Sequence, residues 1–109
     1  MLEAILGSTS AEQVLIFIRA RGTGYAREIA RFFETDLLGI QNQLEKLEAA
    51  GVLVSRSVGR TRPFEFNPRY PFLAELKALL SKALEFYPQQ THEELLLNRR
   101  RPRRTAKPL

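Results

Sequence analysis

A change in the spacing of apolar residues at Gly51 constrains the fold of this chain more than any other feature. Before the glycine, four apolar residues recur at the intervals of one helix face: Leu37, Ile40, Leu44 and Leu47. After it, residues 52–58 and 62–67 alternate like two strands, with the turn at residues 59–61. We therefore predict a helix of residues 37–50, begun by Asp36 and ended by Gly51, that leads directly into a β-hairpin.

Other helical patterns lie on both sides of this unit. Residues 2–6 predict a short helical turn, and the next helix is predicted to run to residue 21 with Ser10 as its N-cap. After a short break, residues 25–33 predict a third helix. A broad apolar face predicts another helix over residues 72–87, and Thr91 is the expected cap of a last short one within residues 89–98.

The net charge of +5 comes from one end of the chain. Of 17 basic residues, six lie between positions 99 and 107, which leaves 11 basic against 12 acidic residues in positions 1–98. The body is therefore close to neutral, and global charge is weak evidence for a nucleic-acid partner. We expect residues 99–109 to be disordered. Two roles remain open for this segment, a nonspecific DNA arm or a solubilising end.

Composition also excludes several kinds of site. The chain has no cysteine and only one histidine, His92, so disulfides and thiolate metal sites are excluded and neither a metal nor a cofactor is expected. The longest apolar run, residues 14–18, is too short for a membrane span, and no basic segment precedes the first apolar residues. We expect a cytoplasmic, nucleoid-associated protein with no membrane partner.

The order of three helices, a hairpin and a helix is that of a winged helix-turn-helix. We therefore expect residues 1–88 to form a mainly α domain with a β-hairpin wing. The chain resembles the core of ArsR/MarR-type winged-helix transcriptional regulators, most closely small prokaryotic domains associated with minimal nucleotidyltransferases. Three stretches carry the resemblance: residues 27–30 (REIA), residues 44–53 (LEKLEAAGVL) and Asn67-Pro68. It implies DNA binding as a homodimer through the N- and C-terminal helices.

The helix of residues 37–50 is the expected recognition helix. Its predicted outer side near the N-terminus carries Leu38, Gly39, Gln41 and Asn42. The two amides can each present a donor and an acceptor to a base edge in the major groove. Tyr25 and Arg27 on the preceding helix are expected to contact phosphates. The alternative is that the two amides belong only to a solvated helix face.

Arginines gather on the expected wing. We predict that Arg56, Arg60 and Arg62 reach the adjacent minor groove or its phosphates. Arg56 could instead pair with Glu65 across the hairpin. For the dimer interface we predict eight apolar residues of the terminal helices: Leu2, Ile5, Leu6, Leu73, Leu76, Leu80, Ala83 and Phe86.

These features predict a sequence-specific regulator that binds double-stranded DNA as a homodimer. The alternative is a winged-helix module that binds an unidentified protein and no DNA. Catalysis is not expected, since the sequence has no paired catalytic carboxylates, no nucleophile beside its histidine and no phosphate loop.

Overall fold

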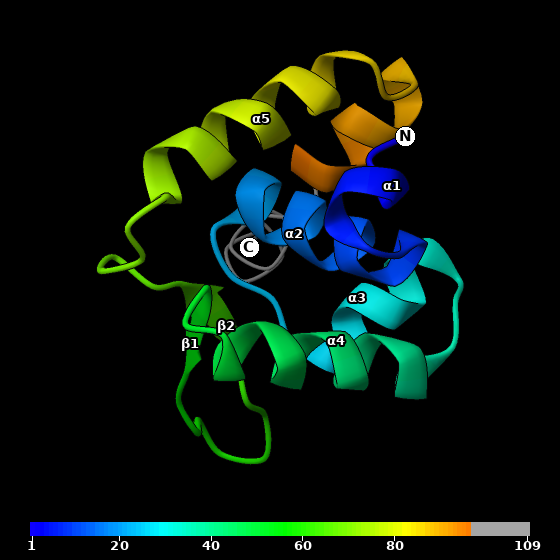
Figure 1. The fold of residues 1–109 in the computed structure, drawn as a ribbon. Coiled ribbons are helices and arrows are strands. Elements are labelled where there is room, and N and C mark those ends of the chain that lie inside the picture. Colours follow the sequence, from blue (N-terminus) through cyan, green and yellow to red (C-terminus); the bar gives the residue numbers. More distant parts are fainter. Residues whose placement is uncertain (97–109) are drawn as a thin grey trace, which may run out of the picture.

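The computed structural model describes residues 1–96, so the predicted end of the last helix and the basic segment 99–109 lie outside the described residues. The small hairpin projects at one end of the molecule beside α4, and the other helices lie on one side of it (Figure 1). The elements are α1 (Glu3–Leu6), α2 (Thr9–Arg21), α3 (Ala26–Phe33), α4 (Leu37–Ala49), β1 (Leu53–Ser55), β2 (Phe64–Phe66) and α5 (Leu73–Glu85), and residues 89–96 are also helical. The predicted mainly α fold with a hairpin wing is confirmed.

Helix α2 forms the centre of the molecule. Five consecutive residues of it, Val14 to Ile18, are almost completely buried, so the helix is enclosed on all sides rather than on one face. It contacts α1, α3, α4, α5 and β2. The capping prediction for this helix is wrong: the helix begins two residues earlier, and Ser8, not Ser10, accepts the hydrogen bond from the Ala11 N–H at 3.0 Å.

The predicted α3 and α4 are confirmed within one residue. Asp36 caps α4 by accepting a hydrogen bond from the Gly39 N–H at 3.0 Å. Glu28 reaches back to accept from the Tyr25 N–H at 3.3 Å, which secures the first turn of α3. Ile40 and Leu44 are buried, so the apolar side of α4 faces the core as its spacing indicates.

The hairpin is shorter than predicted, and a segment outside it also pairs with one of its strands. β1 and β2 pair antiparallel with Leu53 opposite Phe66, and the turn is Gly59–Arg60 alone, because Val58 and Thr61 already exchange both hydrogen bonds. Gly59 has a φ of 60°, which glycine adopts without strain. Gly24 pairs with Phe64 on the other side of β2 (N···O 3.1 and 2.8 Å), so the break between α2 and α3 is attached to the hairpin.

The C-terminal helices pack on the body more closely than predicted. Leu80 and Ala83 of α5 are buried, as is Leu2 before α1, and all three belong to the core of the single chain. Their side chains are already covered within the single chain and offer no surface to a partner, while the dimer interface itself stays a prediction. The predicted cap of the last helix is also wrong: helical residues begin at 89, so Thr91 lies inside the helix.

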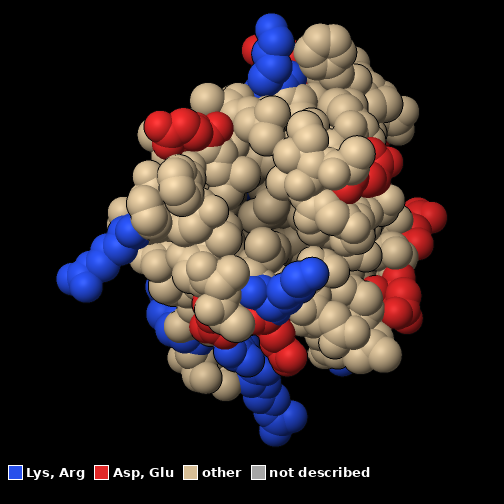
Figure 2. Space-filling view, viewed as in Figure 1, with Lys and Arg blue, Asp and Glu red and all other residues tan. Residues whose placement is uncertain are grey.

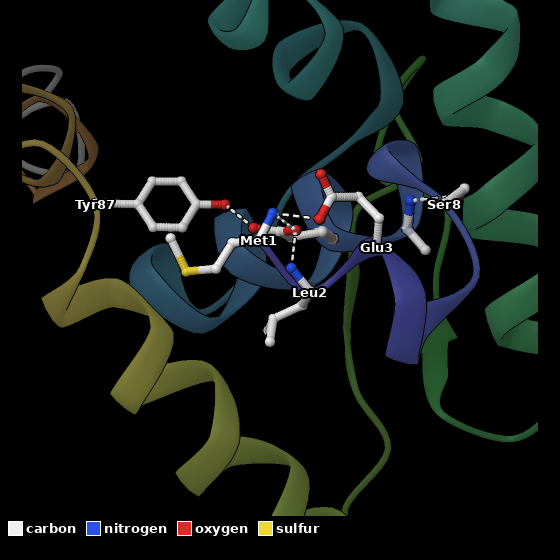
Figure 3. Close-up of polar contacts among 7 residues, drawn as sticks. Met1, Leu2, Glu3, Ser8 and Tyr87 are labelled. Atoms are coloured by element: carbon white, nitrogen blue, oxygen red, sulfur yellow. Dashed lines mark hydrogen bonds and ion pairs between the residues drawn. The ribbon is translucent and has the colours of Figure 1, made fainter.

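A buried carboxylate joins the N-terminus to the residue that follows α5. Glu12 of α2 is 4% exposed and accepts hydrogen bonds from the Leu2 N–H at 2.7 Å and from the Tyr87 hydroxyl. The Met1 ammonium lies 3.2 Å from the same carboxylate. Figure 3 shows Tyr87 approaching from one side and Met1 and Leu2 from the other. Glu12 therefore holds α1 and the end of α5 against α2.

We predict that Gly24→Ala destabilises the chain. A Cβ at this position would lie 2.8 Å from the Phe17 ring and 3.2 Å from Ile29, both fully buried. We expect the free energy of unfolding to fall by about 1–3 kcal/mol in urea titrations, as for other overpacked cores.

Gly39→Ala is the matched control for this change. A Cβ there would meet its nearest atom at 3.5 Å, and Gly39 lies within α4. We expect this variant to be stabilised by about 0.5–1 kcal/mol. A Gly24→Ala variant as stable as the parent chain would contradict the close packing of the α2–α3 connection.

We predict that Tyr87→Phe removes a stabilising contact that depends on pH. Burial, and then the hydrogen bond to Glu12, raise the pKa of Tyr87 above its ordinary value. Because the pKa is higher in the folded chain, the stabilisation is present below about pH 10 and is lost as the pH rises further. We expect the parent to exceed Tyr87→Phe by about 1.5–3 kcal/mol at pH 7, the range for hydrogen bonds to charged groups.

Urea titrations of the parent and of Tyr87→Phe between pH 7 and pH 11 test this. The parent's advantage in the free energy of unfolding should shrink above pH 10. An advantage that stays constant up to pH 11 would mean that the Tyr87–Glu12 contact contributes nothing to the loss of stability at high pH.

Candidate nucleic-acid interface

A cleft of about 550 Å³ lies between the start of α3, one side of α4 and the hairpin. Its polar and charged lining comes from all three elements, so α4 and the hairpin face one space rather than two separate surfaces. The residues that line it are Tyr25, Ala26, Arg27, Gln41, Leu44, Glu45, Arg60, Thr61, Arg62 and Phe64. Five of the nine residues predicted to contact DNA are therefore brought together here.

The remaining predicted residues of α4 lie beside the cleft. Leu38 is 61% exposed, and Asn42 is exposed on the same outer side of the helix. Gly39 is half-buried, and its N–H is already bound by Asp36. The structure thus leaves Gln41 in the cleft and Asn42 next to it, both open to solvent.

Two arginines of the cleft are available for an external partner. Arg27, on the first turn of α3, and Arg60, in the hairpin turn, are exposed. Within residues 1–96, neither guanidinium makes an ion pair or a hydrogen bond at 3.5 Å or less. Unpaired cations on opposite walls of one cleft suit a ligand that carries negative charge along its length.

Arg62 is also in the cleft but is held by the chain itself. Its guanidinium lies 2.6 Å from the Glu48 carboxylate of α4, its Nε donates to Ser55 Oγ at 3.0 Å, and it lies over the Phe64 ring at 5.1 Å. Glu48 also accepts from Ser55 at 2.6 Å. These contacts tie the hairpin to α4. Sequence reasoning assigned Arg62 to DNA and missed this contact, because Glu48 is 14 positions away.

Arg56 lies outside the cleft. It lines a separate shallow depression with Glu65, and the two side chains form an ion pair at 3.8 Å. The cross-hairpin pairing that the sequence left open is therefore present, although both side chains remain largely exposed. An exposed pair at this distance contributes little to stability.

Acidic residues interrupt the positive charge. In Figure 2 the basic side chains gather over the hairpin at the lower end of the molecule, with acidic side chains between them and along the right edge. Glu45 lines the cleft one turn after Gln41, and sequence reasoning did not assign it a role. A carboxylate here repels phosphate but can accept a hydrogen bond from the cytosine amino group.

The part of the chain that the structure describes has no group of three or more metal-binding side chains. None of its helices has the length and apolar character needed to cross a membrane.

We predict that Arg62 and Glu48 are energetically coupled. A double-mutant cycle with Arg62→Gln and Glu48→Gln should give a coupling free energy of about 0.5–1 kcal/mol, the upper range for partly exposed pairs. The matched control is the cycle of Arg56→Gln with Glu65→Gln, a longer and more exposed pair that should show coupling near zero. Equal coupling in the two cycles would contradict a special role of Arg62 in fixing the hairpin.

Comparisons with solved structures identify the fold. A cysteine-to-serine variant of MarR from E. coli superimposes with a TM-score of 0.59 at 18% identity, over 89% of this chain and 69% of that chain. YusO from Bacillus subtilis gives 0.53 at 19% identity, over 91% and 74%. A double mutant of ZitR from Lactococcus lactis in its apo form gives 0.54 at 14%, over 91% and 83%.

The sequence itself matches no family model and no curated protein. The structural likeness supports the MarR part of the resemblance drawn from sequence, while the likeness to ArsR-type proteins and to nucleotidyltransferase-associated domains stays a prediction. The chain therefore has a MarR-type winged-helix fold.

Proposed function

We propose that this protein is a sequence-specific regulator that binds double-stranded DNA, with α4 in the major groove and the hairpin on the adjacent minor groove or its phosphates. The observation that carries the proposal is the single cleft in which Arg27, Gln41 and Arg60 converge from three elements. Its MarR-type winged-helix fold is compatible with this use but does not by itself imply it.

The residues of the cleft have different roles in the proposed DNA binding. Gln41 presents both a donor and an acceptor, and a bidentate contact with adenine discriminates by about 1–3 kcal/mol. Arg27 and Arg60 carry no sequence information in phosphate contacts but fix the register of the duplex. Arg62 and Glu48 hold the hairpin at a constant position relative to α4, and so keep Arg60 at a fixed distance from Gln41.

We further propose that the protein binds as a homodimer. Of the predicted interface residues, Ile5 of α1 and Phe86 at the end of α5 are 70% and 68% exposed, which is unusual for apolar side chains of this size. Glu12 brings these two ends together through Leu2 and Tyr87. Leu6, Leu73 and Leu76 are half-buried. A twofold interface here would place two recognition helices on one face of a palindromic site.

The second candidate is a winged helix that binds a protein. It is favoured by the exposed apolar residues Leu38 on α4 and Val58 in the hairpin, and by the acidic Glu45 within the cleft. Binding of duplex DNA by the purified chain decides between the two candidates, because a protein-binding module should show no affinity that depends on DNA sequence.

We predict that Arg60→Gln weakens duplex binding and lowers its salt dependence. Loss of one phosphate contact should reduce the slope of log K against log salt by about 0.9. Fluorescence anisotropy on duplexes selected by the protein itself would measure this slope. Lys82→Gln is the control, since Lys82 lies on α5, away from the hairpin (Figure 1), and should leave the slope unchanged.

The same anisotropy titrations test whether Gln41 contacts bases. Gln41→Ala should reduce the difference in affinity between selected and random duplexes by about 1–3 kcal/mol, with little change in the salt slope. If Arg60→Gln and Lys82→Gln have the same salt slope, or if Gln41→Ala weakens every duplex equally, the cleft is not the DNA interface.

A further inference from the structure

One carboxylate of the cleft is not used by the fold. Glu45 lies on α4, lines the cleft and is exposed. Among the residues that the structure describes, its side chain makes neither an ion pair nor a hydrogen bond. Glu48, on the next turn of α4, differs because it binds Arg62 and Ser55 of the hairpin. The Glu45 carboxylate is therefore available to a partner of the cleft.

The charges of the cleft that lack an ion pair within residues 1–96 come from three elements and differ in sign. Arg27 belongs to α3 and Arg60 to the hairpin turn, while α4, which carries Glu45, packs against both α3 and β1. The major groove of duplex DNA has a matching cross-section: phosphates line its two rims, and the base edges between them present donors as well as acceptors. Cations from the outer elements and a carboxylate from the middle one suit such a groove. An anion without a donor would gain nothing from Glu45.

The four bases differ in what they offer a carboxylate. In the major groove guanine presents two acceptors, thymine an acceptor and a methyl group, and adenine a donor beside an acceptor. Cytosine presents the N4 amino group alone, so a carboxylate gains a hydrogen bond there without facing an acceptor of the same base. The repulsion between Glu45 and the phosphates, in contrast, is the same for every sequence. A carboxylate in this cleft thus lowers the affinity for all duplexes, and a cytosine at the right position offsets that loss.

Glu45 has a fixed spacing from Gln41, for which we propose the contact with adenine. Residues four apart lie on one side of a helix, and both of these side chains line the cleft. With a rise of about 1.5 Å per residue, Glu45 lies about 6 Å further along α4 than Gln41. Base pairs follow one another at about 3.4 Å, so about two base-pair steps separate the two contacts when α4 lies along the groove.

We propose that Glu45 is a specificity residue of the DNA interface. It accepts a hydrogen bond from the N4 amino group of a cytosine about two base-pair steps from the base that Gln41 contacts. This inference rests on the proposed function and names part of the sequence that the site selects. The discrimination comes partly from repulsion, because the same carboxylate disfavours guanine and thymine at that position.

Base preferences of Glu45 variants test the contact. The parent chain, Glu45→Gln and Glu45→Ala are compared on duplexes that the parent selects from a random pool, with each of the four base pairs placed in turn at every position of the site. The parent should prefer cytosine at one position by roughly 5- to 150-fold, the usual range for one mismatched pair. Glu45→Gln should prefer adenine there, because glutamine matches its donor and acceptor, and Glu45→Ala should show no preference. All other positions should keep their preferences.

Glu75→Gln is the matched control. Glu75 is exposed on the first turn of α5 and is not among the residues that line the cleft, so this variant loses the same charge outside the proposed interface. It should keep every base preference of the parent. Glutamine and alanine are good helix formers, so urea titrations of all three variants should give midpoints close to that of the parent.

A modified cytosine tests the atoms involved. N4-methylcytosine keeps its base pair with guanine, but its methyl group then takes the place of the N–H that faces the major groove. At the predicted position it should weaken binding of the parent by roughly 5- to 150-fold and leave binding of Glu45→Ala nearly unchanged. The proposal is overturned if the parent tolerates the modified base, or if both Glu45 variants keep the parent's preference at every position.

The failures of the two proposals are distinguishable. If the parent binds no duplex DNA, the proposed function falls and this inference falls with it. If the parent binds selected duplexes and Gln41→Ala removes its preference at one position, but the Glu45 variants remove none, the proposed function stands and only the role of Glu45 is excluded.

Discussion

The burial of α2 on every side determines where the functional elements lie. Residues 14–18 are almost completely buried, and each large apolar side chain contributes about 1.5–3 kcal/mol when fully removed from water. Both α4 and β2 pack on this helix, so the two walls of the cleft are positioned by one common support. Gly24 continues that support, since it pairs with Phe64 while leaving room for Phe17 beneath it. The spacing between Gln41 and Arg60 thus depends on contacts far from either residue.

The sequence predicted those elements whose boundaries and buried side are determined by residues close together along the chain. Asp36 and Gly51 bracket α4, and the interval between its apolar residues predicts which side faces the core. The central role of α2 could not be predicted in this way. Apolar residues at the spacing of one helix face imply that the opposite face is exposed to water. Ile16 lies on that opposite face of α2 but is buried. Segments distant in the sequence cover α2, as the contact between Arg21 and Leu95, 74 positions apart, illustrates.

The arginines of the candidate site also show what the sequence alone could not predict. Arg60 and Arg62 are two positions apart and equally basic, so sequence gave no reason to separate them. Their difference arises from Glu48 on α4, which pairs with Arg62, whereas no carboxylate of residues 1–96 pairs with Arg60. Residue type therefore predicted where positive charge gathers, and the fold decides which charge is free for a partner. Glu45 was missed because a carboxylate on a helix is ordinarily only part of a solvated face.

The near-neutral body has a consequence for how such a protein could discriminate among DNA sites. Nonspecific binding to DNA depends on phosphate neutralisation. Among residues 1–96, the cleft offers only two arginines without an ion pair, beside one carboxylate, so the proposed interface would supply little of this neutralisation. Base contacts raise the affinity for some DNA sequences and not for others, whereas phosphate contacts raise it for all. An interface with little positive charge therefore keeps a high ratio of specific to nonspecific affinity. The cost is slow capture and weak overall binding. All of the excess positive charge lies outside residues 1–98, so the charge balance of these residues does not offset that cost.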